Sequence, residues 1–175
     1  IKEIDLERRS VDLRPVRTKR LRDDFHTIGY LRITQFSESV PKKIEEALKE
    51  LKEKEVEGII LDLRNNSGGL VSSGIAVADS FLSERPVVET KDRNGIKDAI
   101  ISQKETSFDG PMVTLVNRGT ASASEILAGS LQDNERSILM GEQTYGKGLI
   151  QSLKSLGEES GIAITVASYL TPKGN

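Results

Sequence analysis

The stretch "EGIILDLRNNSGG", residues 57–69, carries most of the information about the fold. Its first half is short, apolar and rich in β-branched residues, which predicts a strand, and its second half is rich in turn formers. The run that follows, "LVSSGIAVADSFL" (70–82), predicts a helix, and the same order returns in "PMVTLVNRGTASASEILAGSLQ" (111–132). Alternating strands and helices predict an α/β fold with largely parallel strands, in which ligands bind at the carboxyl ends of the strands.

Apolar spacing predicts the other elements. Short strands are expected between residues 4 and 16, and "IGYLRITQF" (28–36) predicts another strand. After Pro41, apolar residues recur at helical spacing up to Leu51, which predicts an amphipathic helix with a solvated charged face. Between residues 84 and 109 only short strand-like pieces appear. Three later runs are expected to complete the same sheet: 137–141, 148–153 and 161–170.

Composition excludes several classes of function. The chain of 175 residues is long enough for one domain with a sizeable core, and its formal charge of −2 comes from scattered acids and bases, which does not suggest nucleic acid. With no Cys and only one His, thiol nucleophiles, disulfides and nearly every His/Cys zinc site are excluded. No apolar run is long enough to span a membrane, and no signal peptide is present. The chain starts without Met, so we expect a fragment from which an export signal or anchor could be missing.

The stretch "GEQTYGKG" (141–148) allows two interpretations of Lys147. It comes close to the G-x-x-x-x-G-K-[ST] loop that binds nucleotide phosphates. However, Gly148 stands where that loop has a hydroxyl, and the alternating run that follows predicts a strand in place of a helix. We therefore favour a chemical role for Lys147 over phosphate binding.

Ser122 in "TASASEI" (120–126) is the candidate nucleophile. One alternative is that it only caps a helix, because Ser122 and Glu125 have the spacing of a capping box. Small neighbours leave room for a substrate carbonyl, and backbone N–H groups at a helix start can stabilise an oxyanion. In the same way "NNSGG" is either a simple turn or a place where Gly68 offers one half of an oxyanion hole, with Ala123 as the other.

A serine nucleophile needs a base, and the chain offers two. His26 lies among acidic residues beside a predicted strand, which favours an ordinary surface histidine. Lys147 lies between two glycines, and we expect it to be desolvated there beside Leu149, since a desolvated lysine can lose its proton near neutral pH. Lys147 is the stronger candidate.

Three segments together resemble the protease core of the C-terminal processing peptidases, or tail-specific proteases. They are "DLRNNSGG" (62–69), "VNRGTASASEILAGSLQDNERSILMGEQTYGKGLIQSL" (116–153) and "ITVASYLTPKG" (164–174). The resemblance runs from about residue 28 to the end. The residues of these motifs are most similar to the cyanobacterial and plastid branch, whose substrates include the precursor of a photosystem II reaction-centre protein. It implies the α/β core shared by Clp proteases and crotonases, with a mixed, largely parallel sheet flanked by helices.

The resemblance also implies roles for individual residues. It makes Ser122 the nucleophile, Lys147 the general base, Gln151 the residue that positions this lysine, and Gly68 and Ala123 the oxyanion donors. Asp133 matches an acidic position that supports activity, although local hydrogen bonds at a helix end explain it equally well. In a straight strand the Cα atoms of Lys147 and Gln151 would lie about 13 Å apart, so we expect a bend or bulge at Gly148.

The implied function is that of a serine endopeptidase that cleaves polypeptides near accessible C-terminal tails through an acyl-enzyme. No metal, cofactor, nucleotide or nucleic acid is implied; membrane-associated substrates and oligomerisation stay open. The resemblance implies export to the periplasm or thylakoid lumen, and it leaves open whether the protein is associated with a membrane there. Its PDZ domain would be missing, with residues 1–27 as a strand-rich lead-in and 28–175 as the protease core. The alternative is a catalytically silent crotonase-like scaffold or peptide-binding module.

Overall fold

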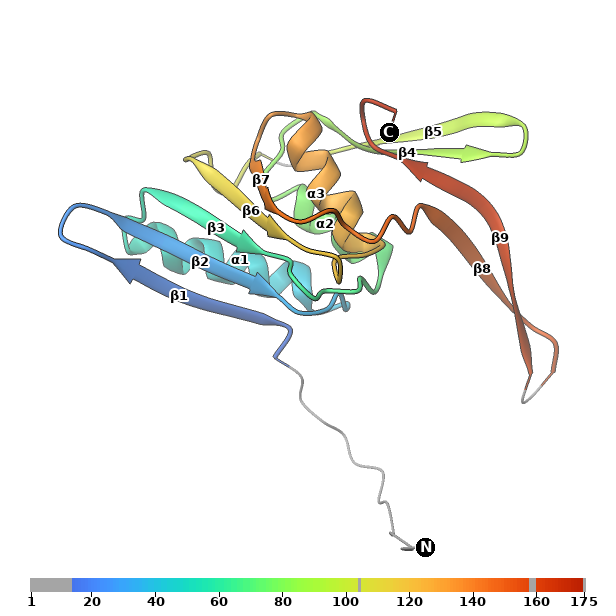
Figure 1. The fold of residues 1–175 in the computed structure, drawn as a ribbon, viewed down its shortest axis with the longest axis horizontal. Coiled ribbons are helices and arrows are strands. Elements are labelled where there is room, and N and C mark those ends of the chain that lie inside the picture. The colour runs from blue at the N-terminus through green and yellow to red at the C-terminus, as the bar shows by residue number, and fades with distance from the viewer. Residues whose placement is uncertain (1–13, 104, 158–159, 175) are drawn as a thin grey trace, which may run out of the picture.

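The computed structural model describes residues 14–103, 105–157 and 160–174. Its main sheet has the strand order β1-β2-β3-β6-β7, with β1 antiparallel to β2 and all other neighbours parallel (Figure 1). The strands are β1 (Val16–Arg22), β2 (Thr27–Ile33), β3 (Gly58–Asp62), β6 (Met112–Val116) and β7 (Ile138–Gly141). The predicted α/β fold with a largely parallel sheet is confirmed. The strands expected between residues 4 and 13 lie outside the described residues.

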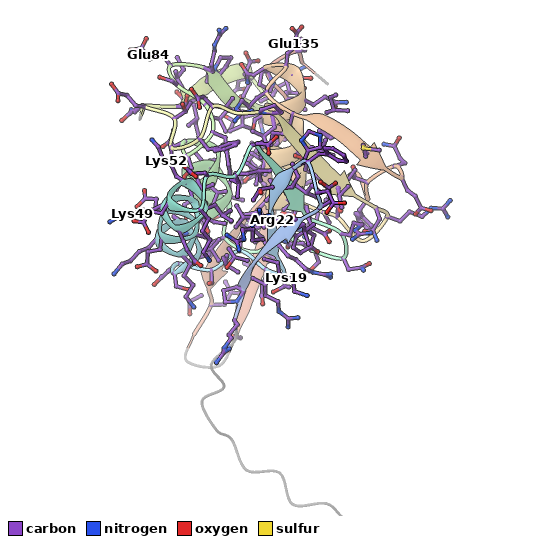
Figure 2. All side chains as sticks on the ribbon, turned by 90° about the vertical axis from the view of Figure 1, so that its left-hand side faces the viewer. Lys19, Arg22, Lys49, Lys52, Glu84 and Glu135 are labelled. Carbon is purple, nitrogen blue, oxygen red and sulfur yellow. The ribbon has the colours of Figure 1, made fainter. Side chains whose placement is uncertain are left out.

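Three helices accompany this sheet: α1 (Val40–Glu53), α2 (Val71–Ala78) and α3 (Ala123–Asp133). Helix α1 confirms the predicted amphipathic pattern, because the apolar residues of its spacing are buried. Figure 2 shows Lys49 and Lys52 on its outer surface, where their charges are solvated. No helix within the described ranges is both long and apolar enough to cross a membrane.

A second, antiparallel sheet has the order β5-β4-β9-β8. Its strands are β4 (Pro86–Asp92), β5 (Gly95–Ile101), β8 (Leu149–Ser155) and β9 (Gly161–Leu170). The prediction that the last two runs complete the main sheet is therefore wrong, since only β7 joins it. The connections from β7 to β8 and from β8 to β9 are too short for a crossover of a dozen or more residues, which parallel addition would need.

The arrangement of β3 and β6 positions the candidate site. The two strands are parallel neighbours, with Ile59 opposite Met112 and Asp62 opposite Leu115. Their carboxyl ends therefore lie at the same edge of the sheet, and so do the two strand-to-helix turns, as the sequence predicts. The predicted boundary at residue 27 stays a prediction; β1, which precedes it, pairs with β2 along its whole length.

Candidate active site

Ser122 stands at the start of α3 in an unusual backbone conformation. It is the N-cap residue of the helix, with φ 58° and ψ −120°, in a region that L-residues rarely occupy. Such strain costs on the order of 1–3 kcal/mol and persists only where the surroundings hold it. Here Ser122 O accepts the N–H groups of Glu125 and Ile126, and Ser122 N donates to the Glu125 carboxylate. Strain at a half-buried serine is typical of functional positions.

Glu125 links the two halves of the predicted dyad. Its Oε2 accepts the N–H of Ser122 at 2.8 Å and that of Lys147 at 2.9 Å, and its Oε1 accepts the N–H of Gly146 at 2.6 Å. One carboxylate thus joins the start of α3 to the loop before β8. The capping-box spacing signalled the first of these bonds, whereas the contacts with the loop were not predicted.

These bonds also argue against the interpretation of residues 141–148 as a phosphate-binding loop. The N–H groups of Gly146 and Lys147 point at the protein's own Glu125, so they do not form an open anion site. The segment leads into strand β8, whereas a phosphate-binding loop leads into a helix. The nucleotide interpretation is therefore not supported by the structure.

Ser122 and Lys147 line the same cavity, of about 360 Å³. It extends along α3 from Ser122 past Ile126 and Gly129 to Gln132. Its other walls come from the second sheet, from β7 of the main sheet and from the loop before β8, with Val87, Val88, Leu139, Gln143, Thr144, Gly148, Tyr169, Leu170 and Thr171 among the lining residues. Most of the exposed wall area is apolar, and the predicted nucleophile and base are among the polar residues of the lining.

The structure does not show the expected desolvation of Lys147. Its side chain is exposed, and Leu149, expected to shield it, is 52% exposed. The reason is architectural: Lys147 comes two residues before β8, and Figure 1 shows the hairpin of β8 and β9 projecting from the rest of the molecule.

Gly68 lies against Ser122, the predicted nucleophile. With φ +103°, a Cβ at this position would come 2.8 Å from Ala121 O and 2.9 Å from Ser122 Cβ, so only glycine fits. Its N–H, however, donates to Asn66 Oδ1 at 2.9 Å. The N–H of Ala123, in the first turn of α3, has no acceptor among the described residues. Of the two predicted oxyanion donors, the N–H of Ala123 is free among the described residues, and the N–H of Gly68 is already hydrogen-bonded.

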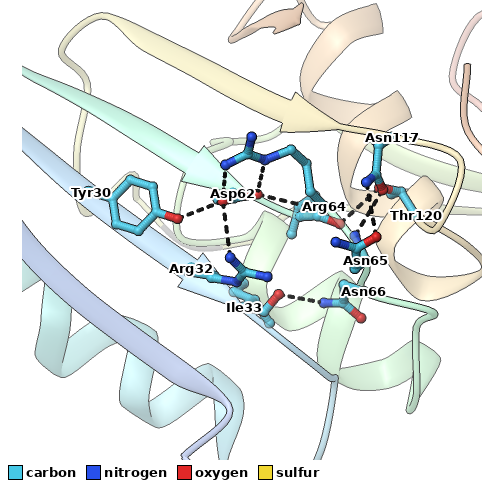
Figure 3. A network of polar contacts seen from close by, with 10 residues as sticks. Tyr30, Arg32, Ile33, Asp62, Arg64, Asn65, Asn66, Asn117 and Thr120 are labelled. Carbon is cyan, nitrogen blue, oxygen red and sulfur yellow. Dashed lines mark hydrogen bonds and ion pairs between the residues drawn. The ribbon is translucent and has the colours of Figure 1, made fainter. Parts of the chain in front are cut away.

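A network around Asp62 supports the turn that carries Gly68 (Figure 3). Asp62 is 0% exposed, and Arg64 donates to both of its carboxylate oxygens, at 3.0 and 2.8 Å. Tyr30 Oη donates to Asp62 Oδ2 at 2.6 Å, and Arg32 lies 3.7 Å away. Burial alone would raise the pKa of Asp62, but the hydrogen bonds from Arg64 and Tyr30 outweigh it and lower the pKa to about 2. Sequence reasoning missed this network, since its members come from two different strands.

A second set of bonds ties the two strand-to-helix turns together. Asn65 N donates to Asn117 Oδ1 at 2.9 Å, and Asn117 Nδ2 donates back to Asn65 Oδ1 at 3.0 Å. Thr120 Oγ1 donates to Leu63 O at 2.8 Å. The segment that carries Gly68 and the segment that carries Ser122 therefore form one polar unit.

Gln151 does not reach the cavity wall. It is exposed on β8, and the irregularity expected at Gly148 lies instead between Ile150 and Gln151, opposite Val166 of β9. The predicted contact with Lys147 is absent from the hydrogen bonds of the described residues. A bulge exists, but its extra residue is Val166 of β9, so β8 itself carries no extra residue.

Asp133 and His26 lie away from Ser122. Asp133 is at the other end of α3, where its Oδ2 accepts the N–H of Lys173 at 2.9 Å. His26 is exposed beside the amino end of β2, with Nδ1 2.9 Å from Glu57 Oε2, and this hydrogen bond raises the pKa of the imidazole. The prediction of a surface histidine is confirmed.

Comparisons with known proteins identify related sequences. The sequence model described as peptidase family S41 matches residues 27–175. The chain is 48% identical to a carboxyl-terminal-processing protease of Synechocystis sp. over 98% of its length, which is 40% of that relative. It is 47% identical to the chloroplastic carboxyl-terminal-processing peptidase 3 of Arabidopsis thaliana over 82% of its length and 28% of that relative.

A solved structure has the same fold. The photosystem II D1 C-terminal processing protease superposes with a TM-score of 0.86 at 38% identity, over 95% of this chain and 46% of that one. The chain thus spans less than half the length of each of these three relatives.

Proposed function

Because the chain belongs to peptidase family S41, we propose that it carries the catalytic core of a serine endopeptidase that cleaves polypeptides near their C-termini. The observation that supports this most is the shared cavity: Ser122 and Lys147 line it together, and Glu125 bonds to the backbone of both. The largely apolar walls offer room for substrate side chains beside the nucleophile.

In this proposal the reaction proceeds through an acyl-enzyme. Neutral Lys147 takes the proton of Ser122 Oγ as the oxygen attacks the carbonyl carbon of the scissile peptide bond. The oxyanion receives the N–H of Ala123 and, once it is free, that of Gly68. The carbon–nitrogen bond then breaks, Lys147 returns the proton to the leaving amine, and water hydrolyses the ester to restore Ser122.

Two further residues keep the roles that the resemblance implies. Gln151 would orient Lys147, which requires its side chain to turn from solvent toward the start of β8. Asp133 would support activity from the far end of α3, where it holds the backbone of Lys173 beside Thr171 in the cavity wall.

The proposed substrates are polypeptides with an accessible C-terminal tail, including membrane-associated ones, and the proposed location is the periplasm or thylakoid lumen. The relatives support carboxyl-terminal processing as the activity, and a chloroplast or a cyanobacterium as the setting, since they are named as chloroplastic and cyanobacterial carboxyl-terminal-processing proteases and, for one structure, as the processing protease of the photosystem II D1 protein. An extended substrate could add to β8, an edge strand that begins next to Lys147.

Ser122→Ala tests the proposal. Hydrolysis of a tailed polypeptide, followed by mass spectrometry, should disappear, while circular dichroism and the melting temperature stay close to the parent, since a lost helix cap costs only about 1 kcal/mol. Cleavage at the parental rate would refute the nucleophile. If neither protein cleaves yet both bind the peptide, the peptide-binding scaffold is the better description.

A further inference from the structure

Asn66 is a buried polar residue to which the proposed mechanism assigns no role. It is 0% exposed, next to the glycine turn at the carboxyl end of β3. Its Nδ2 donates to Ile33 O at 3.0 Å, and its Oδ1 accepts the N–H of Gly68 at 2.9 Å. Both ends of the carboxamide are therefore bonded.

The backbone of Asn66 is held just as firmly. Its carbonyl oxygen accepts the N–H of Ala121 at 3.0 Å and the hydroxyl of Ser124 at 3.0 Å, on either side of the nucleophile. Ile33, at the end of β2, fixes which way the carboxamide faces, because its carbonyl can only accept. The oxygen of Asn66 must then point at Gly68.

This arrangement leaves Gly68 with its N–H turned away from a reacting carbonyl. For the N–H to reach the oxyanion, the peptide plane between Ser67 and Gly68 has to rotate while Asn66 stays in place. Gly68 and Gly69, with φ +103° and +135°, lack the Cβ that would obstruct such a rotation, and Ser67 is exposed.

We propose that Asn66 is a positioning residue for the oxyanion hole: its carboxamide oxygen holds the Gly68 N–H in the substrate-free protein and releases it to the oxyanion during catalysis. This inference rests on the proposed function. A neutral carboxamide suits the role, since a carboxylate at the same place would hold the N–H roughly twice as strongly and release it less readily.

A peptide boronic acid ending in boro-alanine tests the release directly. Ser122 Oγ adds to the boron, its proton passes to Lys147, and the tetrahedral adduct carries a negative charge like the oxyanion. Crystal structures with and without this probe should show Gly68 N within hydrogen-bond distance of a boronate oxygen and parted from Asn66 Oδ1. An adduct on Ser122 with the bond between Gly68 and Asn66 intact would overturn the inference alone, whereas the lack of any adduct would refute the proposed function as well.

Substitution gives an independent measurement. Asn66→Asp should lower kcat by on the order of tenfold or more, against the roughly 10²–10³-fold that follows loss of an oxyanion donor, while KM changes little. Asn65→Asp is the control for the added charge: it places the same charge one residue away at an exposed position, does not touch Gly68, and keeps the oxygen that Asn117 bonds. Each rate is divided by the concentration of active sites titrated with the boronic acid, so that unfolded protein does not lower the measured kcat. Equal kcat values for the two variants would contradict the role of Asn66.

Discussion

The nucleophile and the base of the proposed dyad lie on regions that are packed very differently. Ser122 begins α3, in which Ala123, Leu127 and Leu131 are fully buried. Lys147 leads into the hairpin of β8 and β9, where even apolar residues such as Ile164 remain 42% exposed. Packing fixes the first half of the site, and backbone hydrogen bonds hold the second.

Only a few bonds connect these halves. Besides the Glu125 carboxylate, Tyr145 N donates to Thr120 O at 3.0 Å, and Lys173 N, just after β9, donates to Asp133 Oδ2 at the end of α3 at 2.9 Å. The position of Lys147 relative to Ser122 therefore depends on individual hydrogen bonds, which cost about 1 kcal/mol each to lose. This contrast predicts that removing one of these bonds lowers the catalytic rate without unfolding the protein.

The largest effect is expected at the base itself. Lys147→Arg should lower kcat by roughly 10²–10⁴-fold, the range that a general base contributes, because a guanidinium stays charged. Peptide hydrolysis measures the effect. Lys154→Arg, an equally exposed change in the same hairpin, is the control and should keep parental activity. An active Lys147→Arg protein would show that the exposed hairpin does not supply the base.

Glu125→Gln tests the connection between the halves. A glutamine has one acceptor oxygen for three N–H groups, so the loop should shift and kcat should fall by on the order of tenfold to a hundredfold. Glu135→Gln, at the exposed far end of α3, makes the same change away from the cavity. If both variants have the same kcat, Glu125 does not position the dyad.

The contrast in packing itself predicts a difference in stability. Leu127→Ala, at a fully buried position, should lower the free energy of unfolding by roughly 2–5 kcal/mol, because it leaves a cavity. Ile164→Ala, on the exposed hairpin, should cost on the order of 0.5 kcal/mol. Urea denaturation measures both, and equal costs would mean that the hairpin is as tightly packed in solution as the core.

Acid should destabilise the half of the site that belongs to the core, because it protonates Asp62. Its folded-state pKa of about 2 lies below the ordinary value of 3.8, so its ionisation stabilises the fold above pH 4. This contribution, on the order of 2 kcal/mol, is lost as the pH falls from about 4 to 2. Urea denaturation at pH 6 and pH 2 measures it. Asp62→Asn should flatten that part of the profile, and an unchanged profile would contradict the lowered pKa.

Local patterns were enough to predict the repeated strand, turn and helix, the start of α3 at Ser122 and the approach of Gly68 to it. These features depend on apolar spacing, on turn formers and on two parallel strands ending at one edge. The resemblance then assigned the residues around them. The second sheet was missed because alternation predicts a strand but not its neighbour.

The remaining features arise from contacts between distant parts of the chain. Glu125 reaches Gly146 and Lys147 across two elements, Asn66 faces Gly68 because Ile33 of another strand holds its amide, and the exposure of Lys147 follows from where the hairpin leaves the body. A sequence pattern predicts which groups are present and which element carries them. The free energy of a particular hydrogen bond or buried charge depends on which segments meet in space, so tertiary packing alone sets these contacts.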